Sequence, residues 1–574
     1  MAEPKVVRLG PFTIDLRSGQ FHKHGVRVRL QRQPLLVLEM LLEKPGQIVT
    51  RDELRYRLWP KGVFVDYDQG LNKAVNRLRE VFGDNATEPR WIETLPLRGY
   101  RLLVTPESLQ EPATEAQSFR SLAVLPLENL SAGETQEYFS DGMTDVLIGE
   151  LAQISSLRII SRTSIMPYKR AHDKRIADIA RELNVEAIIE GTVTHASGKV
   201  RITAQLIDAA TDHHMWAQKY ECALSDVLMV QSEVARAIAQ QVNATLRPAE
   251  KYRLARTRAV NPEAYHAYLQ GQYFLHQNIR GIARSLEWFR RSIDADGSNP
   301  DAFAGLAQAL IFAGIYEFQP FAQAYTAARA AAVRALSLDS ENAAAHNAMA
   351  DIKKGFEWDL AGAEREHRMA LDLCPSHLLT RLWLAETLSR MERYHEALEE
   401  SARAVTLDPV SAISHNNRAM LLWRARRWDE AIEQAQVALD LDPSHVNALW
   451  WQGLAYADKG DYPRARACLS KGFEASGAPA LLASLGYVNG VAGDAAQARN
   501  ILVRLEDLAQ KGNVSASNFA VVHAGLGDAD SVFHWLEKAY TSRDGRVHQL
   551  ATPIFDRFRD DPRHMDLKIR TGLP

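Results

Sequence analysis

The stretch LNKAVNRLRE, residues 71–80, decides how the first hundred residues fold. At 100° per residue, its apolar residues and the following Val81 and Phe82 fall within about a third of a helical circumference, which predicts one face packed on a core. The opposite side carries polar residues: Asn72, Lys73, Asn76 and Arg77. Arg79 falls near the edge of that side. A plain solvated surface and a ligand-contacting surface both explain such a face, so the flanking sequence has to decide.

Short strands are predicted before this helix. Residues 10–30 alternate apolar and polar side chains and contain turn signals at Ser18-Gly19 and His24-Gly25. Leucines at helical spacing follow in residues 33–46, which end in Pro-Gly and predict a first helix. The sequence therefore indicates strands that lead into a small helical core.

A second helix and a hairpin complete this domain. TRDELRYRLWP opens with Thr50, and Glu53 three residues later predicts a capping box, while Pro60 ends the helix. WIETLPLRGYRLL, residues 91–103, predicts a basic hairpin with Arg98 at its tip. Three helices followed by a hairpin form a winged helix-turn-helix, whose third helix fits the major groove of B-DNA.

The segments FTIDLRSGQ, LNKAVNRLRE and IETLPLRGYRLL, with the two helices between them, resemble the effector domain of OmpR/PhoB-type response regulators, and still more its one-component form in CadC- and ToxR-like regulators. The resemblance implies DNA contacts from the third helix at Asn72, Lys73, Asn76, Arg77 and Arg79. It also implies a contact from Arg98 in the wing, and helix-entry phosphate contacts from Arg51 and Trp59. Ala74 stands where many relatives have a histidine, so sequence preference does not transfer. No receiver domain precedes the winged helix, so control by aspartyl phosphorylation within this chain is not expected.

The length and charge of the chain fit a soluble protein of several domains. Its 574 residues predict three or four domains, and the net charge is −3. Residues 1–105 hold 18 Lys and Arg against 12 Asp and Glu, so the first part carries six positive charges in excess and the rest nine negative ones. Such asymmetry points to nucleic acid at one end. The most apolar run, Phe303–Tyr316, is too short to cross a bilayer, and a cytoplasmic location is expected.

Residues 105–119 form a polar linker, and residues 120–247 alternate strands with helices in a small α/β module. The order AVLPLENLS, YFSDGMTDVLIGEL, LRIISRTS and VRITAQLIDAATDHHMWA resembles a TolB-N-terminal/FlgO-like module, a family without an agreed ligand. Asp141 and Asp145 are expected to be helix N-terminal carboxylates that favour the dipole. His213 and His214 are expected on a surface turn, and neither a metal nor a cofactor is predicted.

Residues 260–574 repeat a phrase: ALSLDS, ALDLCP, AVTLDP and ALDLDP end at Ser340, Pro375, Pro409 and Pro443, which are 35, 34 and 34 residues apart. Small residues lie at two fixed positions before each phrase end: Ala328 and Ala335, Ala363 and Ala370, Ala397 and Ala404, Ala431 and Ala438. This is the tetratricopeptide pattern, and seven or eight repeats are expected in a superhelix. Of its tryptophans, most are expected in the core and one or two at a partner: Trp383, Trp423, Trp428, Trp450 and Trp451.

The sequence thus predicts a multidomain protein: a winged helix-turn-helix over 1–104, the α/β module over 120–247 and an all-α superhelix over 260–574. The expected function is a one-component transcription regulator that binds double-stranded promoter DNA, with repeats that bind a protein or mediate assembly. A homodimer on DNA is one arrangement that this function allows. One alternative is an interaction scaffold whose winged helix is a docking module. Another is an enzyme with chemistry hidden in 120–247, which the lack of any assembled nucleophile, base and oxyanion donor disfavours.

Overall fold

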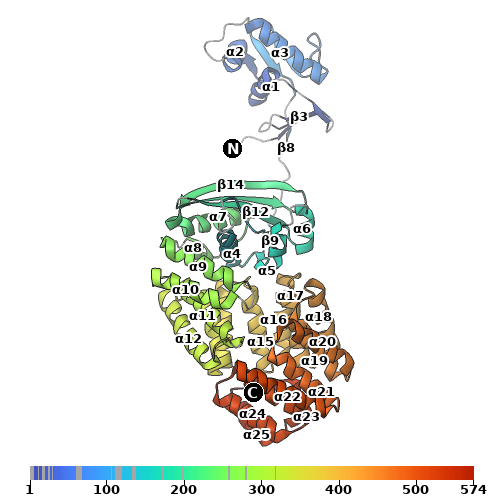
Figure 1. The fold of residues 1–574 in the computed structure, drawn as a ribbon. Coiled ribbons are helices and arrows are strands. Elements are labelled where there is room, and N and C mark those ends of the chain that lie inside the picture. Colours follow the sequence, from blue (N-terminus) through green and yellow to red (C-terminus); the bar gives the residue numbers. More distant parts are fainter. Residues whose placement is uncertain are drawn as a thin grey trace. The chain divides into compact units, whose positions relative to one another are not determined.

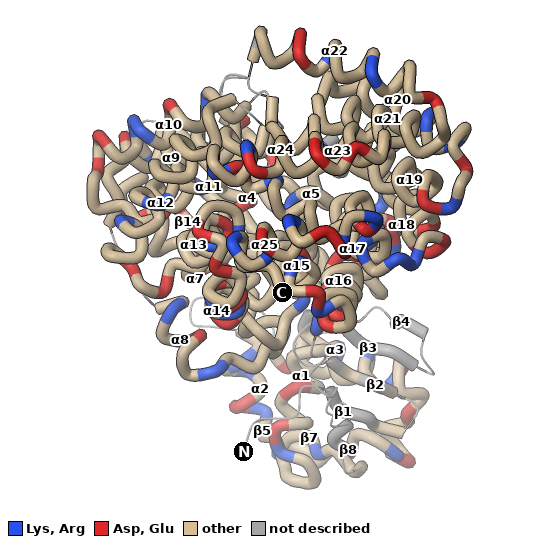
Figure 2. Tube along the Cα trace, turned by 90° about the horizontal axis from the view of Figure 1, so that it is seen from below, with Lys and Arg blue, Asp and Glu red and all other residues tan. Residues whose placement is uncertain are grey.

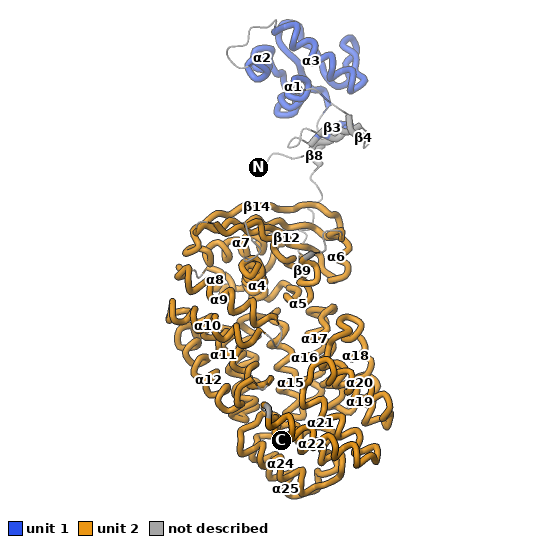
Figure 3. The backbone as a smooth tube through the Cα atoms, in the orientation of Figure 1, with its two compact units in different colours: residues 1–117 blue, residues 118–574 orange. Residues whose placement is uncertain are grey.

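The structure is a computed structural model. It describes residues 6–574 apart from these: 11, 16–19, 24–25, 29, 31, 60–66, 105–106, 110–118, 132–136, 171–173, 197, 256–258, 278–280, 317 and 513. The expected turns at Ser18-Gly19 and His24-Gly25, the helix end at Pro60 and nearly all of the linker lie outside the described residues. The chain divides into two compact units, residues 1–117 and residues 118–574 (Figure 3).

The first unit is a winged helix with an antiparallel sheet before it. The leading sheet runs in the order β4 (Val26–Val28), β3 (Gln20–Lys23), β2 (Phe12–Asp15), β1 (Val6–Leu9) and β8 (Glu107–Leu109). Three helices follow: α1 (Arg32–Glu43), α2 (Arg51–Leu58) and α3 (Tyr67–Phe82). A second sheet has the order β5 (Ile48–Thr50), β7 (Gly99–Leu102) and β6 (Ile92–Leu95).

One core holds this unit together. The rings of Phe12, Phe82 and Trp91 meet at centroid distances of 4.9 to 5.6 Å. The expected capping box is confirmed, because the Thr50 hydroxyl accepts the backbone N–H of Glu53 and the Glu53 carboxylate accepts that of Thr50. Bonds from Lys44 and Thr50 lower the pKa of Glu53 to about 2. These local contacts fix where α2 begins.

The second unit opens with an α/β module. Its sheet has the order β11 (Arg158–Ile159), β9 (Ser121–Val124), β12 (Ala187–Ala196), β13 (Lys199–Asp208) and β14 (His213–Ala223), with β10 (Glu128–Asn129) beside β12. The helical elements are α4 (Glu137–Ala152), α5 (Arg162–Ile165), η2 (Met166–Arg170), α6 (Ile176–Leu183), η3 (Leu224–Asp226), α7 (Val227–Gln241) and α8 (Pro248–Ala255). β9, β11 and β12 run parallel, whereas β12, β13 and β14 form antiparallel hairpins.

Eight helix pairs follow within the described residues. Figure 1 shows many of these helices lying side by side. They are α9 (Pro262–Leu275) with α10 (Ile282–Ala295), α11 (Pro300–Ile315) with α12 (Phe321–Leu338), α13 (Ala343–Ile352) with α14 (Leu360–Leu373), α15 (Leu378–Arg390) with α16 (Tyr394–Leu407), α17 (Ala412–Arg424) with α18 (Trp428–Leu441), α19 (Val446–Asp458) with α20 (Tyr462–Ser476), α21 (Pro479–Val491) with α22 (Ala495–Lys511), and α23 (Ala516–Leu526) with α24 (Ala529–Thr541). The eight alanines of the repeat pattern are all buried. Their small side chains let neighbouring helices pack closely, which explains the periodicity.

The repeats and the α/β module share one core. Leu269 of α9 is fully buried among the residues of α4, α7 and the sheet. The Ser376 hydroxyl donates to the Leu157 carbonyl at 2.8 Å. The backbone N–H of Ser161 donates to the Asp408 carboxylate at 3.2 Å. The module is therefore built into the repeat unit, and the predicted boundary between 247 and 260 separates two parts of one compact body.

The end of the chain packs back on earlier repeats through η6 (Gly545–Ala551), η7 (Pro553–Phe558) and α25 (Pro562–Arg570). His548 accepts a hydrogen bond from Arg390 at 2.9 Å. Arg426 forms a two-pronged ion pair with Asp556, in which its Nε and Nη2 donate at 2.9 and 2.7 Å. These contacts join segments more than a hundred residues apart and close the array on itself.

Candidate nucleic-acid interface

Helix α3 divides into an apolar face and a polar face, as its sequence predicts. The apolar residues are buried in the core: Leu71, Ala74, Val75, Leu78 and Phe82. The four predicted polar residues are exposed: Asn72, Lys73, Asn76 and Arg77. Lys73 and Arg77 lie one helical turn apart, so their charges share one side of the helix. Arg77 pairs with exposed Glu80, an interaction that solvent weakens.

Arg79 does not lie where the sequence placed it, and this part of the expectation is corrected. Its side chain is only 7% exposed. Its guanidinium donates to the Ile92 carbonyl at 2.8 Å and to the Thr94 hydroxyl at 2.7 Å. On the helical wheel Arg79 falls close to the buried residues, and its long side chain reaches β6 instead of solvent. Arg79 therefore connects α3 to the wing.

Arg51 sits at the start of α2 and holds a polar junction together. It forms an ion pair with Asp68 at 2.8 Å, and it donates to the Asn72 Oδ1 at 3.0 Å and to the Tyr100 hydroxyl at 3.2 Å. The Tyr100 hydroxyl in turn donates to the same Asn72 oxygen at 2.8 Å. This network occupies the Asn72 side-chain oxygen twice and leaves its amide nitrogen available as a donor.

Trp59 follows α2 and packs against the beginning of α3. Its ring meets Tyr67 edge to face at 5.6 Å. A Cβ added to Gly70 would lie 2.8 Å from the Trp59 ring, so glycine is required for this close approach. Arg55, exposed on α2, lies over the Tyr67 ring at 4.1 Å. Trp59 is half-buried and orients the two helices.

The wing is the hairpin of β6 and β7. Leu97 has a positive φ of 62° and is 96% exposed, and Arg98 beside it is also exposed. Gly99 has φ of 155°, and a Cβ there would lie 2.1 Å from the Val49 carbonyl oxygen. The Asp84 carboxylate accepts the backbone N–H groups of residues 90–92 and anchors the strand that leads into the wing. The tight strand contact at Gly99 thus holds Arg98 at the tip.

The exposed cations of this unit give it the electrostatics of a polyanion-binding surface. Lys73 and Arg77 on α3, Arg98 on the wing and Arg55 on α2 present charge to solvent. Figure 2 shows basic and acidic positions along the helices of both units. Lys73 and Arg98 have no ion-pair partner among the described residues. Such cations can neutralise phosphates, while the amides of Asn72 and Asn76 can bond to base edges.

In the described part of the α/β module, the two aspartates that the sequence singled out are held in ion pairs. Asp141 pairs with Lys169 at 2.6 Å, and Asp145 pairs with Arg162 at 2.6 Å. Because α4 begins at Glu137, both carboxylates lie beyond its first turn, so the expected role at the helix dipole is replaced by buried ion pairs. Burial raises the pKa of Asp145 to about 7 against the pull of Arg162. The two carboxylates thus balance nearby cations.

Metal ligands do not gather in the described part of the chain, where no group of three or more His, Cys, Asp or Glu side chains is placed to hold a metal ion. His213 and His214 open strand β14 and are exposed. His195 stacks on Phe139 at 4.8 Å, and burial lowers its pKa. These histidines are parts of a sheet edge and a core.

The repeat array surrounds a large, partly open cavity that sequence reasoning missed. Its volume is about 2040 Å³, and among its lining elements are α4, α9 to α15, α17, α19 and η6. Trp423 is 2% exposed and belongs to the core, while Trp383, Trp450 and Trp451 line the cavity. Repeat periodicity predicted a concave surface but gave no sign that the end of the chain covers it, since that contact joins distant residues.

Comparison with known proteins defines the two ends of the chain. Residues 25–102 match the family of transcriptional regulatory proteins, C-terminal domain. Residues 384–445 and 418–479 match the tetratricopeptide repeat family. The chain therefore carries an OmpR/PhoB-type DNA-binding domain at its N-terminus and tetratricopeptide repeats towards its C-terminus, and the predicted multidomain fold is confirmed. The TolB-like resemblance of residues 120–247 stays a prediction.

Individual relatives match parts of the chain. A putative adenylate cyclase 3 of Rhizobium meliloti is 34% identical over 203 residues, which are 35% of this chain and 34% of that protein. A cholera toxin homolog transcriptional activator of Vibrio parahaemolyticus is 34% identical over 91 residues, 16% of this chain and 31% of that protein. The chain thus spans about a third of the length of these curated relatives.

A solved structure also covers the first domain. The RstA DNA-binding domain of Klebsiella pneumoniae, in complex with the RstA box, is 36% identical and covers 17% of this chain and 96% of that chain, with a TM-score of 0.16. Among the described residues of this protein, no helix has both the length and the apolar character needed to cross a membrane.

Proposed function

We propose that this protein is a one-component transcription regulator of the cytoplasm that binds double-stranded promoter DNA through α3 and the wing. The observation that carries the proposal is the exposed face of α3, where two amides and two cations stand together in a domain of the transcriptional-regulator type. A B-DNA major groove is about 12 Å wide and admits one helix. Arg98 would then reach the neighbouring minor groove.

Each predicted contact residue takes one of two roles. Asn72 and Asn76 bond to base edges, and Lys73, Arg77 and Arg98 bind phosphate or guanine. Three others act mainly by positioning these groups: Arg51 through Asn72, Trp59 through the start of α3, and Arg79 through the wing. DNA binding then depends on exposed groups for affinity and on buried groups for geometry.

The repeats supply a protein-binding or assembly function in this proposal. Stacked tetratricopeptide helix pairs present extended surfaces suited to protein partners. A single winged helix covers limited DNA surface, which favours two copies on paired half-sites. The ion pairs of Asp141 with Lys169 and of Asp145 with Arg162 hold α4 against α5 and η2, and we assign the module a role in transmission of a signal.

A binding titration across salt concentrations tests the DNA proposal. Fluorescently labelled duplexes are titrated with the full chain and with residues 1–117, which form a unit with a core of its own. The dissociation constant is expected to rise with salt, with a slope of about 0.9 in log–log form for every phosphate contacted. If the isolated unit shows no salt-dependent affinity for any duplex, the regulator proposal fails.

A further inference from the structure

Inside the repeat unit, one arginine is buried without a counter-charge. Arg424, at the end of α17, is 9% exposed and lines the large cavity. Its Nη1 donates to the Ser389 hydroxyl at 3.2 Å, and its Nε has no partner. Among the described residues, no carboxylate forms an ion pair with it. Burial lowers the pKa of Arg424 to about 10, which reflects the cost of holding this charge away from water.

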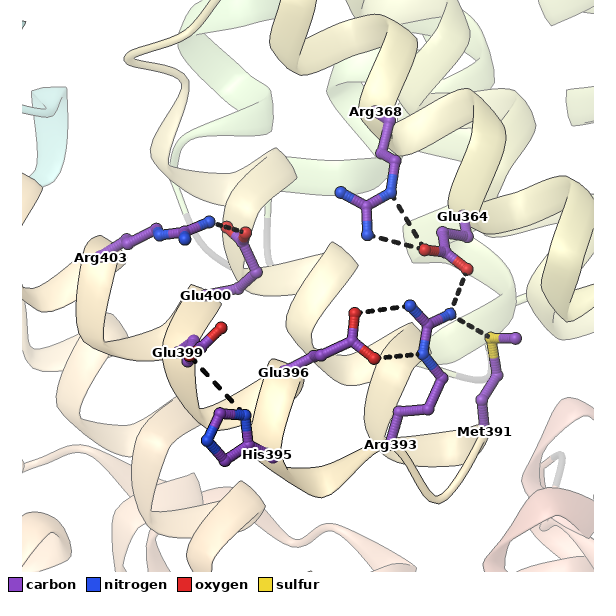
Figure 4. Close-up of polar contacts among 9 residues, drawn as sticks. All are labelled: Glu364, Arg368, Met391, Arg393, His395, Glu396, Glu399, Glu400 and Arg403. Atoms are coloured by element: carbon purple, nitrogen blue, oxygen red, sulfur yellow. Dashed lines mark hydrogen bonds and ion pairs between the residues drawn. The ribbon is translucent and has the colours of Figure 1, made fainter.

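Other arginines of the repeat array have carboxylate partners. Arg393, on the turn between α15 and α16, pairs with Glu364 and with Glu396 at 2.5 and 2.6 Å (Figure 4). Arg426 pairs with Asp556 through two nitrogens. The chain thus supplies carboxylates to arginines at its surface and at its closing contact, and Arg424 is an exception.

The groups around Arg424 do not cancel its charge. Lys354 pairs with Asp351 at 2.6 Å and with Glu386 at 3.4 Å, and Arg390 pairs with Glu386 at 2.8 Å. Three cations therefore face two carboxylates. His548 adds no charge, because burial and Arg390 hold its pKa near 3. One positive charge remains in excess within this group of five side chains, which forms one part of a cavity lining that elsewhere carries more carboxylates than cations.

Polar groups without partners surround this excess charge. The side-chain oxygens of Asn416, Asn417 and Gln549 are buried and accept no hydrogen bond within the described protein, and all three residues line the cavity. Asn417 and Arg424 are seven residues apart on α17 and so lie on one face of it. Buried polar groups normally find partners, so a set of them on one cavity wall indicates a ligand surface. Because the three orphaned atoms are acceptors, they require a ligand that carries N–H or O–H donors.

An apolar wall stands beside Arg424. Trp450 and Trp451 stack on one another at 4.7 Å and line the large cavity. They also line, together with Arg424 and Gln549, a small adjoining cavity of about 40 Å³. A cation, amides and ring faces in one recess suit a molecule with a charged end and an apolar body.

We propose that this recess, centred on Arg424, binds a small organic carboxylate whose aromatic body carries an N–H or O–H donor. The carboxylate supplies the single negative charge that the group around Arg424 lacks, and it matches the fork of a guanidinium. The donor on the ring satisfies a buried amide oxygen. A phosphate ester carries about −1.5 to −2 charges at pH 7, which Glu386 and Asp351 would repel. A folded protein is unsuited as the ligand, because η6 contacts Arg390 and already occupies this part of the concave face.

Thermal unfolding of the full chain with matched pairs of probes tests the proposal. 4-Hydroxybenzoate, 4-hydroxyphenylacetate and indole-3-acetate are each compared with their neutral amides and with inorganic phosphate at equal ionic strength. At a concentration about 100 times its dissociation constant, a bound carboxylate is expected to raise the Tm by about 2 °C. The amides and phosphate are expected to leave it unchanged. If no carboxylate exceeds its amide, the proposal is overturned.

Two arginines of α17 provide the variant and its control. Arg424→Gln is expected to weaken carboxylate binding about tenfold or more. Arg418→Gln is the matched control, because Arg418 lies on the same helix, donates to the Leu398 carbonyl at 3.1 Å and does not line the cavity. Equal weakening by both variants would contradict the assignment.

Stability without any probe gives an independent reading. If Arg424 serves to bind a ligand, its unpaired buried charge destabilises the free protein. Arg424→Met is therefore expected to raise the Tm. Arg390→Met, which removes a paired arginine, is expected to lower it. A Tm lowered as much by Arg424→Met as by Arg390→Met would show a purely structural arginine and sink the proposal. DNA binding by residues 1–117 is unaffected by either result, so the two proposals fail separately.

Discussion

The two units handle positive charge in opposite ways. In residues 1–117 the cations that α3 and the wing present lie in solvent, with the amides of Asn72 and Asn76 beside them. In residues 118–574 one group of cations is turned inwards, where Lys354 and Arg390 meet carboxylates and Arg424 meets a cavity wall. Exposed cations cost little to maintain and suit a large polyanion. A buried cation needs a partner of its own size, so the difference in burial predicts a difference in ligand size.

The largest expected effect concerns Gly99, because the exposed arrangement depends on the wing. Gly99→Ala places a Cβ 2.1 Å from the Val49 carbonyl oxygen at a φ that disfavours side chains. We expect a loss of about 4 kcal/mol in the free energy of unfolding of residues 1–117, measured by urea denaturation. Gly83→Ala is the control, since a Cβ at Gly83 meets nothing within 4 Å, although its φ of 67° still adds strain. Equal losses would show that backbone strain alone matters.

Reversal of the exposed charges is the next largest effect. Lys73→Glu, Arg77→Glu and Arg98→Glu together are expected to weaken duplex binding at least about 100-fold at moderate salt, because each removes a phosphate partner and adds a repulsion. The same three side chains are exposed, so the unfolding free energy should change by about 0.5 kcal/mol or less for each. Unchanged affinity, measured by fluorescence anisotropy, would make the winged helix a docking module.

Two arginines on α3 sharpen the comparison within a single helix. Arg79→Met is expected to destabilise residues 1–117 by about 2 kcal/mol, because the Ile92 carbonyl and the Thr94 hydroxyl lose their buried donor. Arg77→Met is expected to weaken DNA binding with little effect on stability. Thermal unfolding and anisotropy of both variants separate the two roles. The reverse pattern would restore Arg79 as a direct DNA contact.

The smallest expected effect is a pH dependence in the larger unit. A bond to Glu366 at 2.6 Å raises the pKa of His346 above its usual value. The stabilisation is therefore complete below the unfolded pKa near 6.5 and is lost as pH rises through the higher folded pKa. His346→Gln should cost about 1 kcal/mol more at pH 5.5 than at pH 9. Parallel Tm curves for variant and parent across this range would contradict it.

Local patterns in the sequence predicted much of the fold. The stripe of Leu71, Val75 and Leu78 predicted a helix with one buried face, and the capping box at Thr50 predicted where α2 starts. Alanines at 34-residue spacing predicted the repeats, because close helix packing demands small side chains at fixed intervals. These signals depend on neighbours within one or two turns, so they can be read without coordinates.

The candidate site was predicted in part. Asn72, Lys73, Asn76 and Arg77 lie on the expected face, since helix periodicity determines direction. A long side chain near the edge of a helix face can point to solvent or to the core. Arg79 points to the core because the Ile92 carbonyl of β6 accepts its hydrogen bond there. Its destination depends on a strand thirteen residues further along the chain.

By itself, the sequence determined the helices, the wing and the repeat spacing, because these follow from short-range geometry and side-chain size. Only the tertiary structure decided which charges are buried. The hydrogen bond from Arg390 to His548 joins residues 158 positions apart and holds η6 beside the repeats. Arg424 and residues of η6 thereby line the same cavity. Burial is a property of all surrounding segments at once, and no local pattern of residues reports it.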